Sequence, residues 1–267
     1  MVARYMPTDY PEDAPARFRL YGVGLGKTGT VSLSGMFGVH WRSAHEPDWQ
    51  EIIRAGLHPD AMRNGDYLMS PELERIVRAW PWEMNSSTLN YHLMPLIGRV
   101  HPDARFVLTV RDPVAWVASM CRHESDKPRR THWDWWEIRR MRFRPDLYRH
   151  RKSDMALARL GLFSLEGYLR YYARHNARVL AHVPAGRLLV VGVEQLSLRA
   201  TVARLAAFAG IPADRIARER SRMHFSESRF DLFAHVPRDV VEAAAAEYCG
   251  EVWAALRRRA GIPETAR

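Results

Sequence analysis

Residues 22–32 read Gly-Val-Gly-Leu-Gly-Lys-Thr-Gly-Thr-Val-Ser. This glycine-rich loop follows the apolar run Phe18–Leu25, which predicts a buried strand, and it leads into Thr28–Phe37, whose apolar residues have helical spacing. At a junction from strand to helix, backbone N–H groups and the helix dipole converge on one point and attract an anion. The loop is therefore predicted to bind a phosphate-like group, and a tight turn without a ligand is the simpler alternative.

One phosphate-binding pattern, that of the NTP-binding loops, fits these residues incompletely. It requires G-x-x-x-x-G-K-[ST], and Gly26-Lys27-Thr28 supplies its end, but Tyr21 stands where the first glycine belongs. The basic residues are almost all arginine, and the only other lysines are Lys127 and Lys152. The lysine in the loop is therefore a candidate for a specific role.

A second pattern, the dinucleotide-binding G-x-G-x-x-G, is matched by Gly24, Gly26 and Gly29. Glu46 and Asp48 follow at about the distance expected of a ribose ligand. This match predicts an NAD(P)-dependent oxidoreductase as an alternative function. It leaves the lysine and the final serine of the loop without a role.

A second anion site is predicted after the clearest strand of the sequence, Arg105–Val110, whose lack of alternation suits a sheet covered on both faces. The strand runs into Arg111, and Ser119 follows eight residues later, about two turns into a helix opened by Pro113. Arginine forms forked, charge-assisted hydrogen bonds to phosphate oxygens. The alternative is that Arg111 pairs with a nearby carboxylate while Ser119 merely packs.

Together these motifs resemble those of sulfotransferases that use 3′-phosphoadenosine-5′-phosphosulfate (PAPS). Residues 27–32 are similar to the family's 5′-phosphosulfate loop, although Val31 stands where the family often has threonine, a hydroxyl that Ser32 could supply. Arg111 and Ser119 resemble its 3′-phosphate motif, and the likeness extends through Arg187–Pro212. The resemblance implies PAPS as donor, PAP as product and no metal. The implied donor-binding residues are Gly26, Lys27, Thr28, Gly29, Thr30, Val31, Ser32, Arg111 and Ser119.

The resemblance also implies catalytic residues. A loose in-line transfer places charge on the leaving oxygen, which Lys27 is suited to neutralise, and the acceptor must lose a proton to a base. The family uses His or Glu, often just after its second strand, where this chain has His45 and Glu46. We favour His45, with Glu46 close behind and Glu83 in reserve; the alternative is that both are surface loop residues.

Strands alternating with helices predict a three-layer α/β fold with a mostly parallel central sheet, similar to P-loop NTPases, with helical insertions. Residues 1–17 are predicted to be an N-terminal arm and 18–267 a single sulfotransferase domain. Within it, 131–150 is rich in tryptophan and arginine and predicts a lid or insertion that faces the acceptor or packs in the core. The predicted strands are Phe18–Leu25, Trp41–His45, Arg105–Val110 and Arg187–Val193, and the predicted helices include Thr28–Phe37, Asp48–Ala55, Pro71–Trp80, Ser164–Ala181, Arg199–Ala209 and Pro237–Arg259.

The composition limits the class of protein and the kinds of partner. The 267 residues carry a net charge of +10, which favours an anionic partner. The absence of a long apolar run and the acidic residues near the N-terminus predict a cytoplasmic protein without a membrane partner. The two cysteines are too few for a disulfide framework. We expect a small-molecule acceptor and no nucleic-acid partner, although a basic nucleic-acid-binding protein is a further alternative, and a homodimer is left open.

Overall fold

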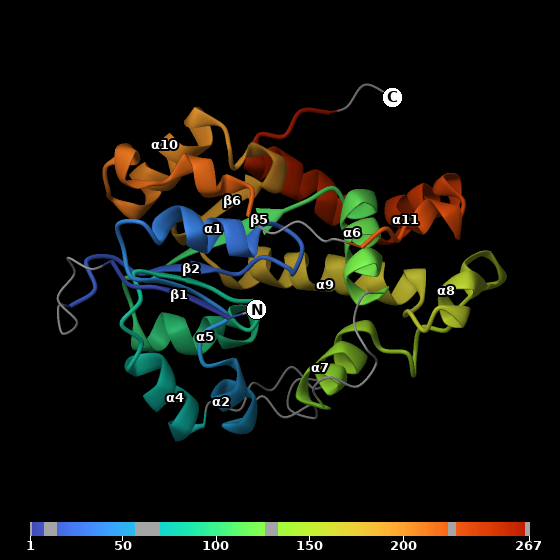
Figure 1. Cartoon of the computed structure of the whole chain (residues 1–267), viewed down its shortest axis with the longest axis horizontal. Helices are drawn as coiled ribbons and strands as arrows, with labels where there is room; N and C mark the ends of the chain where they lie inside the picture. The colour runs from blue at the N-terminus through green and yellow to red at the C-terminus, as the bar shows by residue number, and fades with distance from the viewer. Residues whose placement is uncertain (1, 8–14, 57–69, 126–132, 224–227, 265–267) are drawn as a thin grey trace.

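A six-stranded sheet of order β1-β3-β4-β2-β5-β6 forms the centre of the molecule (Figure 1). The computed structural model describes residues 2–7, 15–56, 70–125, 133–223 and 228–264, with the backbone alone at 133–135. All strands but the edge strand β1, which is antiparallel to β3, run parallel to their neighbours. The predicted α/β fold with a mostly parallel sheet is therefore confirmed. The strands are Ala3–Tyr5 (β1), Leu20–Gly22 (β2), Ser43–His45 (β3), Met84–Ser86 (β4), Arg105–Val110 (β5) and Leu188–Gly192 (β6).

Helices cover both faces of the sheet because successive strand residues point to opposite sides and both sets are apolar. Leu20 and Val107 pack on one face, against α1 and α10, whereas Tyr21 and Phe106 pack on the other, against α5 and α9 (Figure 1). The helices are Thr30–Phe37 (α1), Trp49–Arg54 (α2), Pro71–Arg78 (α4), Asn90–Val100 (α5), Pro113–Ser125 (α6), Trp133–Phe143 (α7), Met155–Arg159 (α8), Leu165–His182 (α9), Arg199–Ala209 (α10) and Arg238–Ala260 (α11). No helix in the described ranges is long and apolar enough to cross a membrane.

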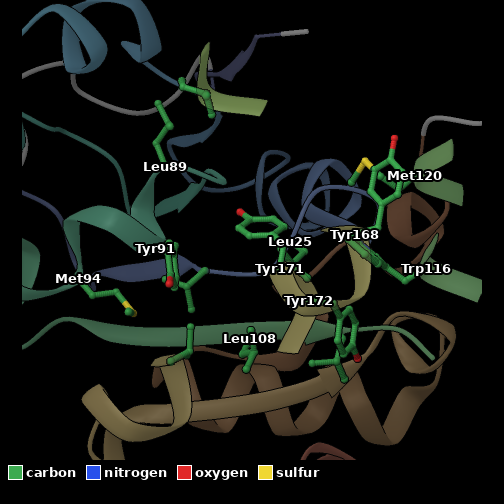
Figure 2. Close-up of a cluster of buried hydrophobic side chains, with 14 of the residues drawn as sticks. Leu25, Leu89, Tyr91, Met94, Leu108, Trp116, Met120, Tyr168, Tyr171 and Tyr172 are labelled. Atoms are coloured by element: carbon green, nitrogen blue, oxygen red, sulfur yellow. The ribbon is translucent and has the colours of Figure 1, made fainter. Parts of the chain in front are cut away.

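The hydrophobic core between the sheet and helices α5 and α9 includes a residue of the glycine-rich loop. Leu25 is buried with Tyr91 of α5, Trp116 of α6 and Tyr172 of α9 (Figure 2). The loop is thus held from the side of the sheet opposite α1.

Two segments of the predicted arm and insertion form regular structure. Within the arm, β1 pairs with β3, and Tyr5 packs over Gly38, where an added Cβ would lie 2.4 Å from its ring. Within 131–150, α7 buries Ile138, Met141 and Phe143 against α9. Residues 131 and 132 lie outside the described residues, and the division into an arm and a single domain stays a prediction.

Glu83 is at the wrong end of the sheet to be the reserve base. It precedes β4, so it lies at the amino edge of the parallel strands, where its carboxylate accepts from Arg42 Nε at 3.1 Å and Arg42 Nη2 at 2.9 Å. Both side chains are buried, and the backbone N–H groups of Arg42 and Arg17 donate to the same carboxylate. A buried carboxylate needs such pairing because an unpaired charge there costs several kcal/mol, on the order of 3–5. The reserve assignment of Glu83 as the base is therefore wrong.

Candidate functional site

The candidate site lies at the carboxyl edge of the sheet, where the parallel strands end together. The glycine-rich loop follows β2, and Arg111 follows β5. His45 is the last residue of β3 and Glu46 comes directly after it, whereas Ser87 and Thr88 follow β4. Ligand sites in open α/β sheets form at this edge. Three of the four described non-glycine residues with positive φ lie here, namely Lys27, Glu46 and Asp48. Backbone strain of this kind concentrates at functional sites.

The first half of the glycine-rich loop is anchored to the neighbouring strand. The Thr28 hydroxyl donates to the Leu25 carbonyl at 2.6 Å and lies 2.9 Å from the Thr109 hydroxyl of β5. Gly24 passes so close that a Cβ there would lie 2.2 Å from Thr109 Oγ1. The glycine is required by this close approach, and the Thr28 side chain stabilises the turn. Its predicted role as a donor ligand stays a prediction.

The second half of the loop opens α1. Gly29 has φ 89°, and an added Cβ would lie 2.8 Å from Val193 Cγ2, so only glycine fits. The first intrahelical hydrogen bond runs from Leu33 N to Gly29 O, which leaves the N–H groups of Thr30, Val31 and Ser32 without an intrahelical partner. Lys27, half-buried with φ 70°, precedes them. This is the arrangement of an anion-binding helix N-terminus.

Ser32 has a different partner from the expected one. Its hydroxyl accepts from Met223 N at 3.0 Å and lies 3.3 Å from Met223 O, so it holds the segment that follows Arg218–Ser221 against α1. The sequence could not reveal this contact because it joins residues 191 positions apart. Ser32 thus has a structural partner, and its role as a donor ligand stays a prediction.

The second predicted motif lies beside the loop. Trp116 of α6 donates its indole N–H to the Gly26 carbonyl at 3.0 Å, and Met120 Cε lies 3.7 Å from a Cβ placed on Gly26. Ser119 is three residues after Trp116, so it shares this side of the helix. Asp112 caps α6 by accepting from the N–H groups of Val114 and Ala115. The helix that carries Ser119 is therefore fixed against the glycine-rich loop.

Arg111 lies at the start of the same motif and has a carboxylate neighbour. Its Nε is 3.5 Å from Glu194 Oε1, and its carbonyl accepts from the Tyr172 hydroxyl at 2.7 Å. Glu194 follows β6 and is largely exposed. The pairing expected from the simpler alternative is thus present, but it is an exposed contact and therefore weak.

The two candidate bases, at and just after the end of β3, are held by the last residue of β4 and by the turn that follows it. His45 Nδ1 lies 2.9 Å from the Ser86 carbonyl; because a carbonyl only accepts, Nδ1 carries the proton and Nε2 the lone pair in the neutral ring. Glu46 accepts from the Ser87 hydroxyl at 2.6 Å and from Thr88 N and Oγ1, both at 2.9 Å. The sequence-based prediction gave Ser87 and Thr88 no contact with Glu46, although the polar run Ser86-Ser87-Thr88 just before a helix was an available signal.

A buried histidine supports the loop from α9. His175 Nε2 lies 2.8 Å from the Val23 carbonyl, so Nε2 donates, and the Tyr91 ring stacks on the imidazole with centroids 4.0 Å apart. Burial, which outweighs the hydrogen bond to Val23, lowers the pKa of His175 to about 3. The ring is neutral at physiological pH and acts as a positioning group.

The fold excludes one of the two alternatives for the loop. In the dinucleotide-binding order 3-2-1-4-5-6, the strand before the fingerprint pairs with the next strand of the chain. Here β4 lies between β2 and β3, so Glu46 is not placed as a ribose ligand of that fold. The strand order and the position of the loop instead agree with the predicted α/β fold that is similar to P-loop NTPases.

A family model described as "Sulfotransferase domain" matches residues 19–213, and the chain belongs to the sulfotransferase family. Similar solved structures include a sulfotransferase from Alicyclobacillus acidocaldarius, with 17% identity and a TM-score of 0.49, covering 91% of this chain and 96% of that one. Sulfotransferase STF1 from Mycobacterium tuberculosis has 15% identity and a TM-score of 0.44, covering 88% and 77%. Mouse sulfotransferase SULT7A1, solved in complex with PAP, has 15% identity and a TM-score of 0.44, covering 94% and 91%. No curated protein sequence matches the chain significantly.

Lowering the pH should decrease the free energy of unfolding, and part of this decrease should come from His175. The unfolded imidazole binds a proton near its ordinary pKa of about 6.5, whereas the folded ring binds one only near a pKa of about 3. The unfolded state therefore holds more protons between these values, and stability falls as the pH drops through this window, by at most about 1.4 kcal/mol per pH unit for one group. His175→Gln, which keeps an N–H donor, should show a shallower loss in urea unfolding between pH 7 and 4.5. His182→Gln, at the exposed end of the same helix, is the control, and parallel curves for wild type and His175→Gln would contradict the assignment.

Proposed function

We propose that this sulfotransferase transfers the sulfuryl group of PAPS to a hydroxyl or amine of a small-molecule acceptor and releases PAP. The observation that carries the proposal is the hydrogen bond from Trp116 to the Gly26 carbonyl, because it brings α6, which contains Ser119 and follows Arg111, alongside the glycine-rich loop. A donor with a 5′-phosphosulfate and a 3′-phosphate needs two anion sites on one edge. An NTP- or dinucleotide-binding protein has no need of the second.

The donor would span these two sites. The N–H groups of Thr30–Ser32 and the Lys27 ammonium would hold the 5′-phosphosulfate, as at other helix N-termini that bind anions. Arg111 and Ser119 would hold the 3′-phosphate. A phosphate is a stronger guanidinium partner than an exposed carboxylate at 3.5 Å, so it would displace Glu194 from Arg111.

The reaction is an in-line displacement at sulfur. The acceptor oxygen or nitrogen forms a bond to sulfur while the bond from sulfur to the 5′-phosphate oxygen breaks, and that oxygen leaves with PAP. Because negative charge grows on the leaving oxygen, Lys27 would stabilise the transition state more than the bound donor. The acceptor proton passes to the base.

For the base we propose His45, whose tautomer leaves Nε2 able to accept a proton. Glu46 is the second candidate, since three hydrogen bonds from Ser87 and Thr88 leave one of its oxygens with accepting capacity. Those same bonds give Glu46 a positioning role if His45 is the base. The two roles predict different effects of substitution.

Binding of PAP is the primary test. Adenosine 3′,5′-bisphosphate should raise the melting temperature of the wild-type protein in a concentration-dependent manner, because it binds the folded state alone. NAD and a single-stranded oligonucleotide of equal charge concentration are the comparisons. Stabilisation by NAD or by the oligonucleotide, with none by the bisphosphate, would overturn the proposed donor.

Lys27 and Arg111 should differ in which kinetic quantity they affect. Lys27→Ala should lower kcat roughly 100-fold or more while the dissociation constant of PAP changes little, because its main interaction forms in the transition state. Arg111→Ala should weaken PAP binding at least tenfold, because it removes a forked ionic pair between the guanidinium and the 3′-phosphate. Calorimetry and steady-state kinetics measure both quantities, and the opposite order would reverse the assignment.

The base can be identified by comparing His45→Gln with Glu46→Gln. If His45 is the base, its variant should lose roughly 100-fold or more in kcat together with the low-pH limb of the pH profile. Glu46→Gln should retain that limb and chiefly lower the melting temperature. A lost limb in Glu46→Gln and a retained one in His45→Gln would make Glu46 the base.

A further inference from the structure

The chain makes a strained turn between β3 and α2, directly after the candidate base His45. Glu46 has φ 50° and Asp48 has φ 53°, so both adopt left-handed backbone, which residues other than glycine rarely do. Pro47 lies between them, and the residue before a proline prefers extended backbone, which makes the conformation of Glu46 still less favourable. Such a turn persists only where surrounding contacts hold it.

The Asp48 carboxylate supplies one set of these contacts. Asp48 stands at the N-cap of α2, where an aspartate commonly accepts from N–H groups of the first helical turn, yet its side chain makes no such bond. Instead Oδ2 accepts from the indole N–H of Trp80 at 2.9 Å, and Oδ1 accepts from Arg4 Nη2 at 2.7 Å. The carboxylate is therefore directed away from its own helix, and it joins the turn to residues 32 and 44 positions distant.

The two donors to Asp48 are themselves held in place. The Trp80 ring is buried in the core, with its centroid 6.0 Å from that of the Tyr21 ring on β2. Arg4 belongs to β1, which pairs with β3, and its guanidinium lies 5.8 Å from the ring centroid of Trp82. Trp80 is thus a rigid anchor, whereas Arg4, whose side chain is 54% exposed, adds a weaker contact that solvent screens.

On the other side of the turn, both candidate bases are bonded to the end of β4 and the residues after it. The Glu46 carboxylate accepts from the N–H and the hydroxyl of Thr88, and the Glu46 N–H donates to the Ser86 carbonyl at 3.2 Å. The same carbonyl accepts from His45 Nδ1. The positions of both bases therefore depend on the direction in which the turn leaves β3.

We propose that Asp48 is a positioning residue for the sulfuryl transfer: its carboxylate, anchored on Trp80, holds the left-handed turn that places the two candidate bases. The inference rests on the proposed function and adds a residue that acts through the bases. Without this anchor the turn would relax toward extended backbone, and the Glu46 carboxylate would then leave Thr88. Because Arg4 contacts the same carboxylate, the N-terminal strand β1 contributes to the position of the turn.

Amide hydrogen exchange at Thr88 tests this role without a substrate, because the Thr88 N–H is protected while it donates to Glu46. Asp48→Gly adopts left-handed backbone without strain but lacks the carboxylate. The N–H of Leu33, which donates to Gly29 at the start of α1, is the internal reference. Relative to this reference, exchange at Thr88 should be at least tenfold faster in Asp48→Gly than in the wild-type protein.

Two further variants separate the carboxylate from the backbone. Asp48→Asn tolerates left-handed backbone and keeps a side-chain carbonyl for the indole donor, so exchange at Thr88 should stay within threefold of wild type. Glu74→Gln is the matched control on α4. It also removes a carboxylate that accepts from two side chains, Arg78 and Arg99, both at 2.6 Å. Because it leaves the bonds of Asp48 in place, exchange at Thr88 should not change.

Kinetic measurements connect the turn with the reaction. With PAPS as donor and 4-nitrophenol as the acceptor probe, Asp48→Gly should lower kcat at least tenfold. Calorimetry should give a dissociation constant of PAP within twofold of wild type, because the turn lies outside the glycine-rich loop. Asp48→Asn should recover most of the lost turnover. If the wild-type protein does not use 4-nitrophenol, the exchange rates decide alone.

Four results would overturn the inference. They are unchanged exchange at Thr88 in Asp48→Gly, equal acceleration at Thr88 and Leu33, a normal kcat despite accelerated exchange, and a loss of PAP affinity as large as the loss of kcat. If Asp48→Gly fails to fold, Trp80→Phe removes the indole donor while keeping an aromatic ring, and the same acceleration at Thr88 is expected of it. Failure of PAP to bind the wild-type protein would instead refute the proposed function, and the exchange comparison would be unaffected.

Discussion

The carbonyl groups of the glycine-rich loop are fixed by three buried donors. His175 donates to Val23 O, the Thr28 hydroxyl to Leu25 O, and the Trp116 indole to Gly26 O, at 2.8, 2.6 and 3.0 Å. These carbonyl groups are directed into the protein, whereas the N–H groups of Thr30, Val31 and Ser32 have no intrahelical partner. Because the donors come from α9, the loop itself and α6, the whole arrangement depends on these helices packing against one sheet face. An anion site without this support would have to order itself on binding, which weakens affinity.

The two edges of the sheet use charge differently. At the amino edge Arg42 and Glu83 form an ion pair within the core, with side-chain exposures of 1% and 0%. Their charges therefore stabilise the fold and do not face a ligand. At the carboxyl edge Lys27 and Arg111 are both half-buried and lie at the candidate site. A sequence cannot tell the two situations apart, because Glu46 and Glu83 both stand beside short strands. Only the direction of the strands separates a structural carboxylate from a candidate base.

The long apolar elements could be predicted from the sequence, as could the short strands β2 and β3, whereas the short strands β1 and β4 were not predicted. Arg105–Val110 and Arg199–Ala209 form the strand and the helix predicted at those residues, and the Ser70 and Ser164 caps begin α4 and α9. Strands β1 and β4 have three residues each, too few for a hydrophobic period. Without β4 the turn at Ser87 and Thr88 could not be placed beside Glu46, and the contacts of Ser32 and Asp48 were equally hidden because they join distant parts of the chain.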